Sequence, residues 1–190
     1  MGTNKNVYQI KISLKYIKPM IWRRFLVEDS IKLPDLHKVI QTVMGWTNSH
    51  LHQFIIKERF YGEPGEDSFE EIVDYRKLML KSVLSFEKEK ITYEYDFGDG
   101  WEHELVLEKI LNNQTIENPI CVAGKRNCPP EDCGGPYGYM DLLNVIADPE
   151  NEEYKEMKSW IGDDFDSEYF DKEWINRLLT REDYGCLSLL

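Results

Sequence analysis

Side chains that bind soft metal ions gather in the second half of the sequence. They are one histidine and three cysteines: His103, Cys121, Cys128 and Cys133. Zinc takes imidazole and thiolate ligands, so this set predicts a candidate zinc site, and zinc is the candidate cofactor. His50 and His52 are further possible nitrogen ligands. The spacing is looser than a paired CxxC motif, and the alternative is that Cys128 is a buried thiol and His103 a core histidine bonded to a carbonyl.

A second set combines charged groups with an aromatic ring and an imidazole. Its members form the candidate binding pocket: Arg23, Arg24, Asp96, Asp99, Trp101 and His103. The strand that carries Arg23 and Arg24 has large groups on both faces, which predicts that it is covered on both sides. A buried arginine needs an acidic partner, and we expect Asp96 and Asp99 to supply it.

These ion pairs have two interpretations. They either stabilise the fold, or they line a pocket that binds a small anion or a peptide. In the second case His103 is placed to act as an acid or base near neutral pH. An enzyme built this way would combine His103 with Asp99, Glu102 or Cys128 on a small substrate, and this is the alternative to a binding domain. The sequence assigns no catalytic residue.

The stretch CPPEDCGGPYGY, residues 128–139, is rich in proline and glycine. Proline restricts the backbone and glycine allows angles closed to other residues, so we predict a rigid lead-in to a helix. Glu131 and Asp132 are expected to pair with Lys125, Arg126 or backbone donors. The stretch lacks the Lys-Ser/Thr ending of a phosphate-binding loop, and the chain contains no Gly-x-Ser-x-Gly nucleophile motif.

The elements that position these residues follow from the hydrophobic periodicity. Alternating residues predict an N-terminal hairpin, a strand near 50–57 and a hairpin over 91–109 that turns at Gly98-Asp99-Gly100. The alternation places Phe97 and His103 on the apolar face of the last hairpin. Residues 62–74 predict a surface loop.

Helical spacing predicts a helix at 34–44, with Pro34 in its first turn and Gly45 at its end, a short helix near 76–84 and further helices in the C-terminal third. Strands come mostly first and helices mostly last. The predicted fold class is α+β, with a mostly antiparallel sheet on which the helices pack, in a single domain over residues 1–190.

Four blocks of sequence resemble the plasmid pRiA4b ORF-3-like family. In order they are PMIWRRFLV (19–27), LHKVIQTVMGWTNSHLHQF (36–54), YEYDFGDGWEHEL (93–105) and CPPEDCGGPYGY (128–139). The similarity extends over about residues 7–180. It implies a fold and a set of positions without an established reaction. Some members of the family look like passengers of mobile elements, which suggests a further alternative, an accessory role in DNA transactions.

Composition narrows the classes of partner. The 23 basic and 35 acidic residues give a formal net charge of −12, which opposes direct contact with nucleic acid. No apolar run approaches the length of a membrane span, and the first residues lack the apolar core of a secretory signal. We therefore expect a soluble, cytoplasmic domain whose cysteines are thiols or ligands, and whose partner is a protein or a small ligand.

Overall fold

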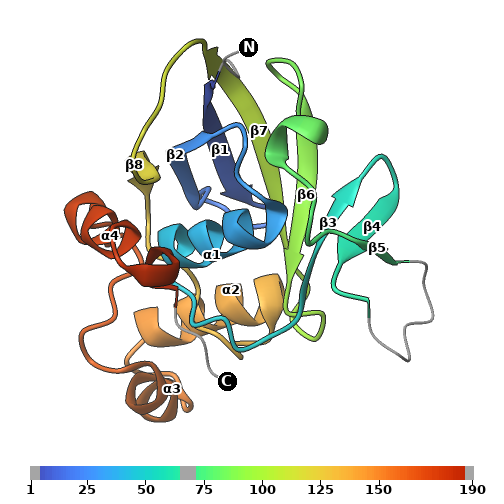
Figure 1. The fold of residues 1–190 in the computed structure, drawn as a ribbon. Coiled ribbons are helices and arrows are strands. Elements are labelled where there is room, and N and C mark those ends of the chain that lie inside the picture. The colour runs from blue at the N-terminus through green and yellow to red at the C-terminus, as the bar shows by residue number, and fades with distance from the viewer. Residues whose placement is uncertain (1–4, 65–71, 187–190) are drawn as a thin grey trace.

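Alternating apolar and polar residues build one sheet, which runs through the part of the chain that the computed structural model describes, residues 5–64 and 72–186 (Figure 1). Its strands are β1 (Val7–Leu14), β2 (Trp22–Glu28), β3 (His52–Ile56), β4 (Arg59–Gly62), β5 (Ile72–Asp74), β6 (Lys90–Tyr95), β7 (Trp101–Leu111) and β8 (Ile120–Lys125). Their order in the sheet is β5-β4-β3-β6-β7-β1-β2-β8, and only β4 and β5 pair in parallel. This confirms the predicted class, α+β with a mostly antiparallel sheet.

Helix α1 (Leu33–Met44) covers the inner face of the sheet. Pro34 lies in its first turn, and its apolar side is fully buried at Leu36, Val39, Ile40 and Val43. The helix ends at Gly45, whose φ of 98° suits glycine and whose N–H donates to the carbonyl of Gln41 at 2.8 Å. The predicted helix at 34–44 is confirmed.

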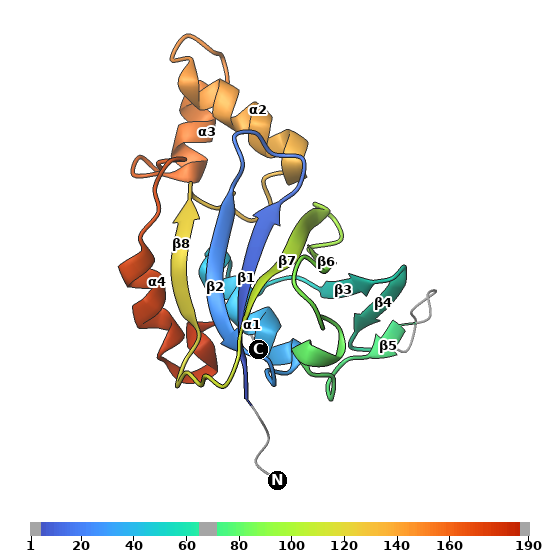
Figure 2. The same ribbon diagram turned by 90° about the horizontal axis from the view of Figure 1, so that it is seen from above.

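The outer face of the sheet corrects one expectation. In Figure 2 the strands β8, β2 and β1 face the viewer and α1 lies behind them. Trp22, Arg24 and Leu26 on that outer side are only half buried, so β2 is not covered on both sides. Charged side chains can line this face because water reaches it, and the Arg24 guanidinium lies over the Trp22 ring, 5.2 Å from its centroid.

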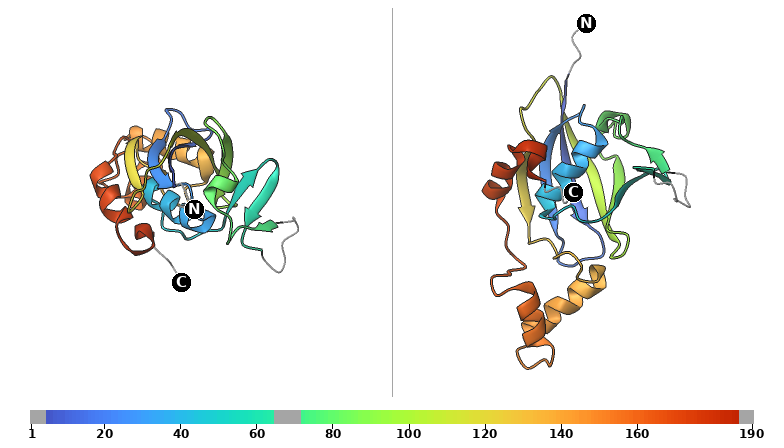
Figure 3. Two further views of the ribbon diagram at one scale, coloured as in Figure 1. Left: turned by 45° about the horizontal axis from the view of Figure 1, so that its top comes forward. Right: turned by 60° about the horizontal axis from the view of Figure 1, so that its bottom comes forward.

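The C-terminal third supplies three more α-helices: α2 (Gly135–Ala147), α3 (Tyr154–Ile161) and α4 (Lys172–Leu179). Helix α4 lies against β8 and α1, whereas α3 lies against α2 at one end of the molecule, away from the sheet (Figure 3). None of the residues of α3 is fully buried. The predicted helices are therefore present, but α3 packs on another helix and not on the sheet.

Three further expectations change in detail. The helix expected near 76–84 is a single 3-10 turn, Leu80–Ser82, and a second such turn covers Glu182–Gly185. The expected loop at 62–74 begins and ends in strands, and its residues 65–71 lie outside the described residues. The last hairpin is confirmed, but Phe97 is exposed because Asp96 takes a left-handed conformation, φ 56°, and breaks the alternation.

Candidate functional site

Three loops meet at the end of the sheet nearest α2, the lower end in Figure 1. They are residues 45–51 after α1, residues 96–100 between β6 and β7, and residues 128–134 before α2. The N–H of Asp96 donates to the carbonyl of Leu51 at 2.8 Å, and the N–H of Gly134 donates to Oδ2 of Asp99 at 3.2 Å. Motifs that are far apart in the sequence thus form one surface.

Glu131 ties two of these loops and the end of β6 together. Its Oε1 accepts from the hydroxyl of Tyr95 at 2.6 Å and from the N–H of Thr47 at 3.1 Å. Its Oε2 accepts from the hydroxyls of Thr47 and Ser49. Burial raises the pKa of this carboxyl group, but the hydrogen bonds from Thr47, Tyr95 and Ser49 outweigh burial and lower the pKa overall. Glu131 therefore stays ionised and holds its loop in place.

The anchored loop directs its next residue, Asp132, to the imidazole of His50. Oδ1 of Asp132 lies 3.3 Å from Nε2 of His50. This nitrogen is buried and makes no hydrogen bond, because the geometry to Asp132 does not meet the angle that a hydrogen bond needs. On the other side of the ring, Oδ2 of Asp96 lies 3.7 Å from Nδ1. Oδ1 of Asp96 is already occupied, because it accepts from the N–H groups of Gly98 and Asp99 at 3.0 and 3.3 Å. The imidazole of His50 thus lies between two carboxylates.

His50, Asp96 and Asp132 bring three possible metal-ligand atoms within 4.8 Å of one another. No other group of this kind occurs among residues 5–64 and 72–186. One imidazole nitrogen and two carboxylate oxygens suit zinc and similar divalent ions. Asp96 is buried, His50 is half buried and Asp132 is exposed, so an ion held there would remain open to solvent on one side. The arrangement can therefore hold a metal ion and leave room for another ligand.

The residues first expected to bind zinc lie elsewhere. His103, Cys121, Cys128 and Cys133 do not belong to the cluster just described. His103 is fully buried on the inner face of β7, with its Nδ1 3.3 Å from the carbonyl oxygen of Tyr93. Burial lowers its pKa to about 3, so the imidazole is neutral and cannot reach a substrate at the surface.

The three thiols of that set are poor nucleophiles. Burial raises the pKa of Cys121 to about 11 and that of Cys133 to about 12, and it raises the pKa of Cys128 further. A thiol needs to ionise to attack a substrate. The four residues of the sequence-predicted zinc set thus do not form a metal-ligand group among the described residues.

The residues of the candidate pocket also separate. Arg23 and Arg24 are neighbours on one strand and face opposite sides of the sheet. Nε of Arg24 donates to Oε2 of Glu108 at 2.5 Å on the outer face, while Arg23 is buried on the inner face and donates only to carbonyl oxygens. Asp96 and Asp99 are thus not their partners, and they lie in the β6–β7 loop. Trp101 is buried in the core beside Trp46, with 6.0 Å between the ring centroids.

The expected pairing of the acidic loop with a backbone donor is confirmed for Glu131, which accepts from the N–H of Thr47, whereas its pairing with Arg126 is not found. Glu131 pairs with hydroxyl and amide groups, and Arg126 donates to Oε1 of Glu168 at 2.6 Å. His50 and His52, both named as possible ligands, differ in role. His52 is the first residue of β3, and its Nε2 shares a hydrogen bond with the hydroxyl of Tyr75 at 2.8 Å. His50 precedes the strand and faces the loops. The polar run TNSH before β3 is the sequence signal that could have placed His50 at a loop site.

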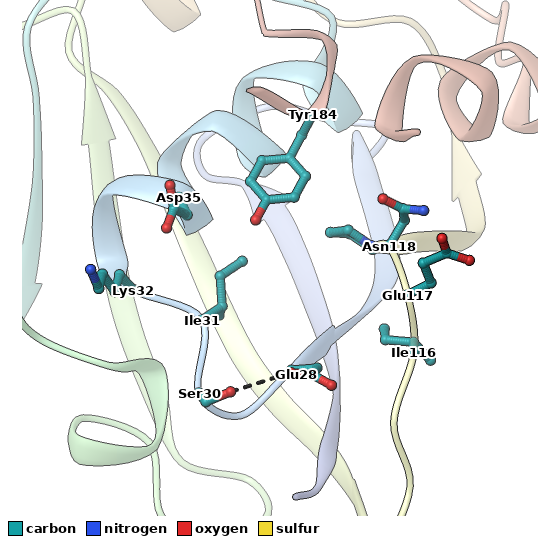
Figure 4. A pocket seen from close by; sticks show the side chains of 10 residues that line it. Glu28, Ser30, Ile31, Lys32, Asp35, Ile116, Glu117, Asn118 and Tyr184 are labelled. Carbon is teal, nitrogen blue, oxygen red and sulfur yellow. Dashed lines mark hydrogen bonds between the residues drawn. The ribbon is translucent and has the colours of Figure 1, made fainter. Parts of the chain in front are cut away.

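A second cavity lies at the opposite end of α1, between the start of that helix and residues 116–119 (Figure 4). Glu28, Asp35 and Glu117 line it, with Tyr184 across from them. Two of these acids already have partners, because Glu28 lies 3.2 Å from Nζ of Lys5 and Asp35 lies 3.9 Å from Nζ of Lys38. Two of the three carboxylates in this cavity are therefore already paired with lysines, which makes it a weaker candidate for a binding site than the three-loop site.

The fold and the site together define an α+β protein with an acidic, histidine-centred site between three loops at one end of its sheet. The chain belongs to the plasmid pRiA4b ORF-3-like family, and the match to that family's sequence pattern covers residues 6–174. It is 38% identical over 164 residues to the "Uncharacterized protein y4hQ" of Sinorhizobium fredii (strain NBRC 101917 / NGR234), a match that covers 85% of this chain and 84% of that protein.

A solved structure shows the same fold. It is the "Protein of Unknown Function MM3350" from Methanosarcina mazei Go1, with a TM-score of 0.81 and 43% sequence identity. The match covers 90% of this chain and 98% of the other. These relatives establish the family and the architecture, and no reaction is established for the family members named here. No helix among the described residues is long and apolar enough to cross a membrane.

Proposed function

We propose that the chain is a cytoplasmic binding domain that holds one divalent metal ion, zinc first among the candidates, between His50, Asp96 and Asp132. The observation that carries this proposal is the set of three ligand atoms within 4.8 Å, supplied by three different loops. Glu131 and backbone hydrogen bonds hold the three loops around the imidazole, and a cation would offset the repulsion between the two carboxylates.

The ion would give the domain a way to bind its partner. Zinc sites with three protein ligands keep a position open for water or another ligand. A carboxylate or carbonyl oxygen of a small ligand or a partner protein can take such a position. Direct contact with nucleic acid is not expected, because the formal net charge of −12 opposes a polyanion, and an accessory role in DNA transactions would need a protein partner.

Metal binding is tested by native mass spectrometry and calorimetry with zinc and manganese. We expect one ion per chain and a loss of affinity of tenfold or more in Asp132→Asn and His50→Ala. Asp132 suits this test because its side chain is 74% exposed and asparagine tolerates its φ of 59°. The matched control is Glu152→Gln, which alters an exposed carboxylate elsewhere. A folded wild-type chain that takes up neither ion ends the proposal.

A metal-assisted hydrolase is the second candidate function. It is favoured by the half-buried His50 and exposed Asp132, which leave the cluster accessible to a substrate. A metal ion at such a site lowers the pKa of a bound water and makes it a nucleophile near neutral pH. Turnover of simple ester or phosphoester substrates by the zinc-loaded chain, abolished in Asp132→Asn, would favour this function over binding alone.

A further inference from the structure

Arg23 is a buried cation that lacks a carboxylate partner. Its residue is 3% exposed, and its Nε donates to the carbonyl of Val43 at 2.8 Å. Its Nη1 donates to the carbonyls of Trp22 and Lys125 at 2.9 and 3.0 Å. Within the described ranges, no residue accepts a hydrogen bond from Nη2, and no carboxylate lies within ion-pair distance.

Two other arginines at the edge of the core are each paired with a carboxylate, as is usual for a buried or half-buried guanidinium. Arg24 pairs with Glu108, and Arg126 pairs with Glu168. An arginine keeps its proton even when buried, so Arg23 remains a cation. The carbonyl of Val43 belongs to the last turn of α1, and a helix C-terminus carries about half a negative charge at most. The three carbonyls orient the guanidinium and leave Nη2 without a protein acceptor, and Nη2 is not fully closed off from water.

Arg23 is one of the residues that line a cavity of about 110 Å³. The cavity lies between the end of α1, the segment before α4, and α4 itself, which are neighbours in Figure 1. Its lining is mainly apolar, with Val43, Met44, Phe170, Trp174, Ile175 and Leu178 among the contributors. A buried positive charge at the wall of an apolar cavity is the pattern that recognises an acid with a hydrocarbon tail.

The local backbone favours this geometry. The Phe170 ring lies over the guanidinium, with 4.8 Å between its centroid and Cζ of Arg23. Gly124 on β8 makes room for both groups, because a Cβ there would come within 2.6 Å of the Phe170 ring and 2.8 Å of Cδ of Arg23. The ring and the strand therefore hold the guanidinium in one orientation, which lowers the entropy cost of binding an anion.

One acid also lines the cavity and limits the ligand. Asp171 accepts from the N–H of Trp174 at 2.8 Å through Oδ1 and caps α4. Its Oδ2 accepts from the hydroxyl of Tyr169 at 3.4 Å. Because this carboxylate is committed to the helix, it does not pair with Arg23, but its charge repels a dianion. The site thus favours a monoanion over phosphate.

We propose that the cavity beside Arg23 binds a small monocarboxylic acid with a short branched apolar tail, whose carboxylate pairs with Nη2. A cavity of about 150 Å³ takes benzene, and this cavity of about 110 Å³, which is open to solvent on one side, suits an acid of about six heavy atoms, such as 2-methylpropanoate. This site is separate from the three-loop site and does not depend on the metal ion proposed there.

The test is a titration of the full-length, isotope-labelled chain followed by nuclear magnetic resonance. The probes are 2-methylpropanoate, the uncharged amide of the same shape, and inorganic phosphate. We expect saturable shifts of the Trp174 indole N–H and the Gly45 amide with 2-methylpropanoate, at a dissociation constant of about 1–10 mM for so small a ligand. Trp174→Phe assigns the indole signal. Equal binding of the amide or of phosphate would overturn the proposal.

Two variants locate the site. Leu178→Phe narrows the cavity without altering Arg23, and we expect it to weaken the acid at least fivefold. Arg23→Gln should abolish binding, and if that variant does not fold, Leu178→Phe and the amide comparison still decide. Asp132→Asn is the control at the other site and should bind the acid as the wild type does. Unchanged affinity in Leu178→Phe, or no saturable shift in the wild type, contradicts the inference.

Discussion

The imidazoles of His37 and His52 stack face to face, with ring centroids 3.4 Å apart and planes 3° from parallel. Tyrosine hydroxyls hold both rings, because Nδ1 of His37 lies 2.8 Å from the hydroxyl of Tyr93 and Nε2 of His52 lies 2.8 Å from that of Tyr75. Burial lowers the pKa of His37 to about 4. Burial, and then the proximity of His37, lower that of His52 to about 2. The pair is therefore neutral in the folded protein.

Acid should unfold the protein through these buried imidazoles. Their pKa values, and that of His103 at about 3, lie below the value of about 6.5 in an unfolded chain. The unfolded state thus takes up protons first, so stability is complete above pH 6.5 and falls as the pH drops. At pH 5 the protonation of each of these three imidazoles in the unfolded chain lowers the free energy of unfolding by at most about 2 kcal/mol.

Urea unfolding at pH 7 and pH 5 measures this cost. The pH range from 5 to 7 lies above the usual pKa of glutamate, so carboxylates contribute little to the difference in stability between the two pH values. An unchanged urea midpoint between pH 7 and pH 5 would show that the three rings are not held neutral.

Glu131 and Asp132 are adjacent, and we expect a change at Glu131 to lower stability and a change at Asp132 to lower metal affinity. Glu131→Gln removes the charge that accepts hydrogen bonds from Thr47, Ser49 and Tyr95, which should cost about 2–3 kcal/mol. Asp132→Asn alters an exposed group and should change stability by no more than about 0.5 kcal/mol while it weakens metal binding tenfold or more. Thermal unfolding of both variants checks this, and similar destabilisation by both would contradict the role of Glu131 as the anchor.

The fold could be predicted from the sequence because its signals are local. Ile91, Tyr93 and Tyr95 alternate as a half-buried strand must, and Pro34 and Gly45 bracket a helix whose apolar residues recur with the right period. Such patterns report which face of an element is buried, whatever the partner element is. They say less about helices such as α3, whose weakly apolar face rests on another helix.

The site could not be predicted in the same way, because its geometry depends on loops. Asp96 and Asp132 take left-handed backbone conformations, which no periodicity reports. Glu131 finds its partner Thr47 at a separation of 84 residues, so only the tertiary fold reveals their contact. The cysteines and His103 drew attention by their chemistry, but their burial makes them part of the core. Residue type alone did not distinguish a ligand from a packed side chain.

Asn176 protects the exposed edge of β8. Its Oδ1 accepts from the N–H of Cys121 at 2.8 Å, and its Nδ2 donates to the carbonyl of Cys121 at 3.0 Å. The amide thus mimics a neighbouring strand and occupies groups that another chain could otherwise bind. Asn176→Ala should cost about 1–2 kcal/mol and promote self-association, measured by light scattering. Arg177→Ala on the same helix is the control, and a monomeric, equally stable Asn176→Ala chain would refute this role.

Gly135 lets the start of α2 dock on the β6–β7 loop. A Cβ at this position would lie 2.2 Å from the carbonyl oxygen of Asp99, and the φ of 70° also disfavours a side chain. Gly162 has a φ of 89° but no atom within 4 Å of its would-be Cβ, so it isolates the backbone effect. Gly162→Ala should cost about 1–2 kcal/mol and leave metal binding intact. Gly135→Ala should cost clearly more and weaken metal binding, because displacement of the loop moves Asp96 away from His50. Equal losses of stability in the two variants, with unchanged metal affinity in Gly135→Ala, would show that the docking of these loops does not control the site.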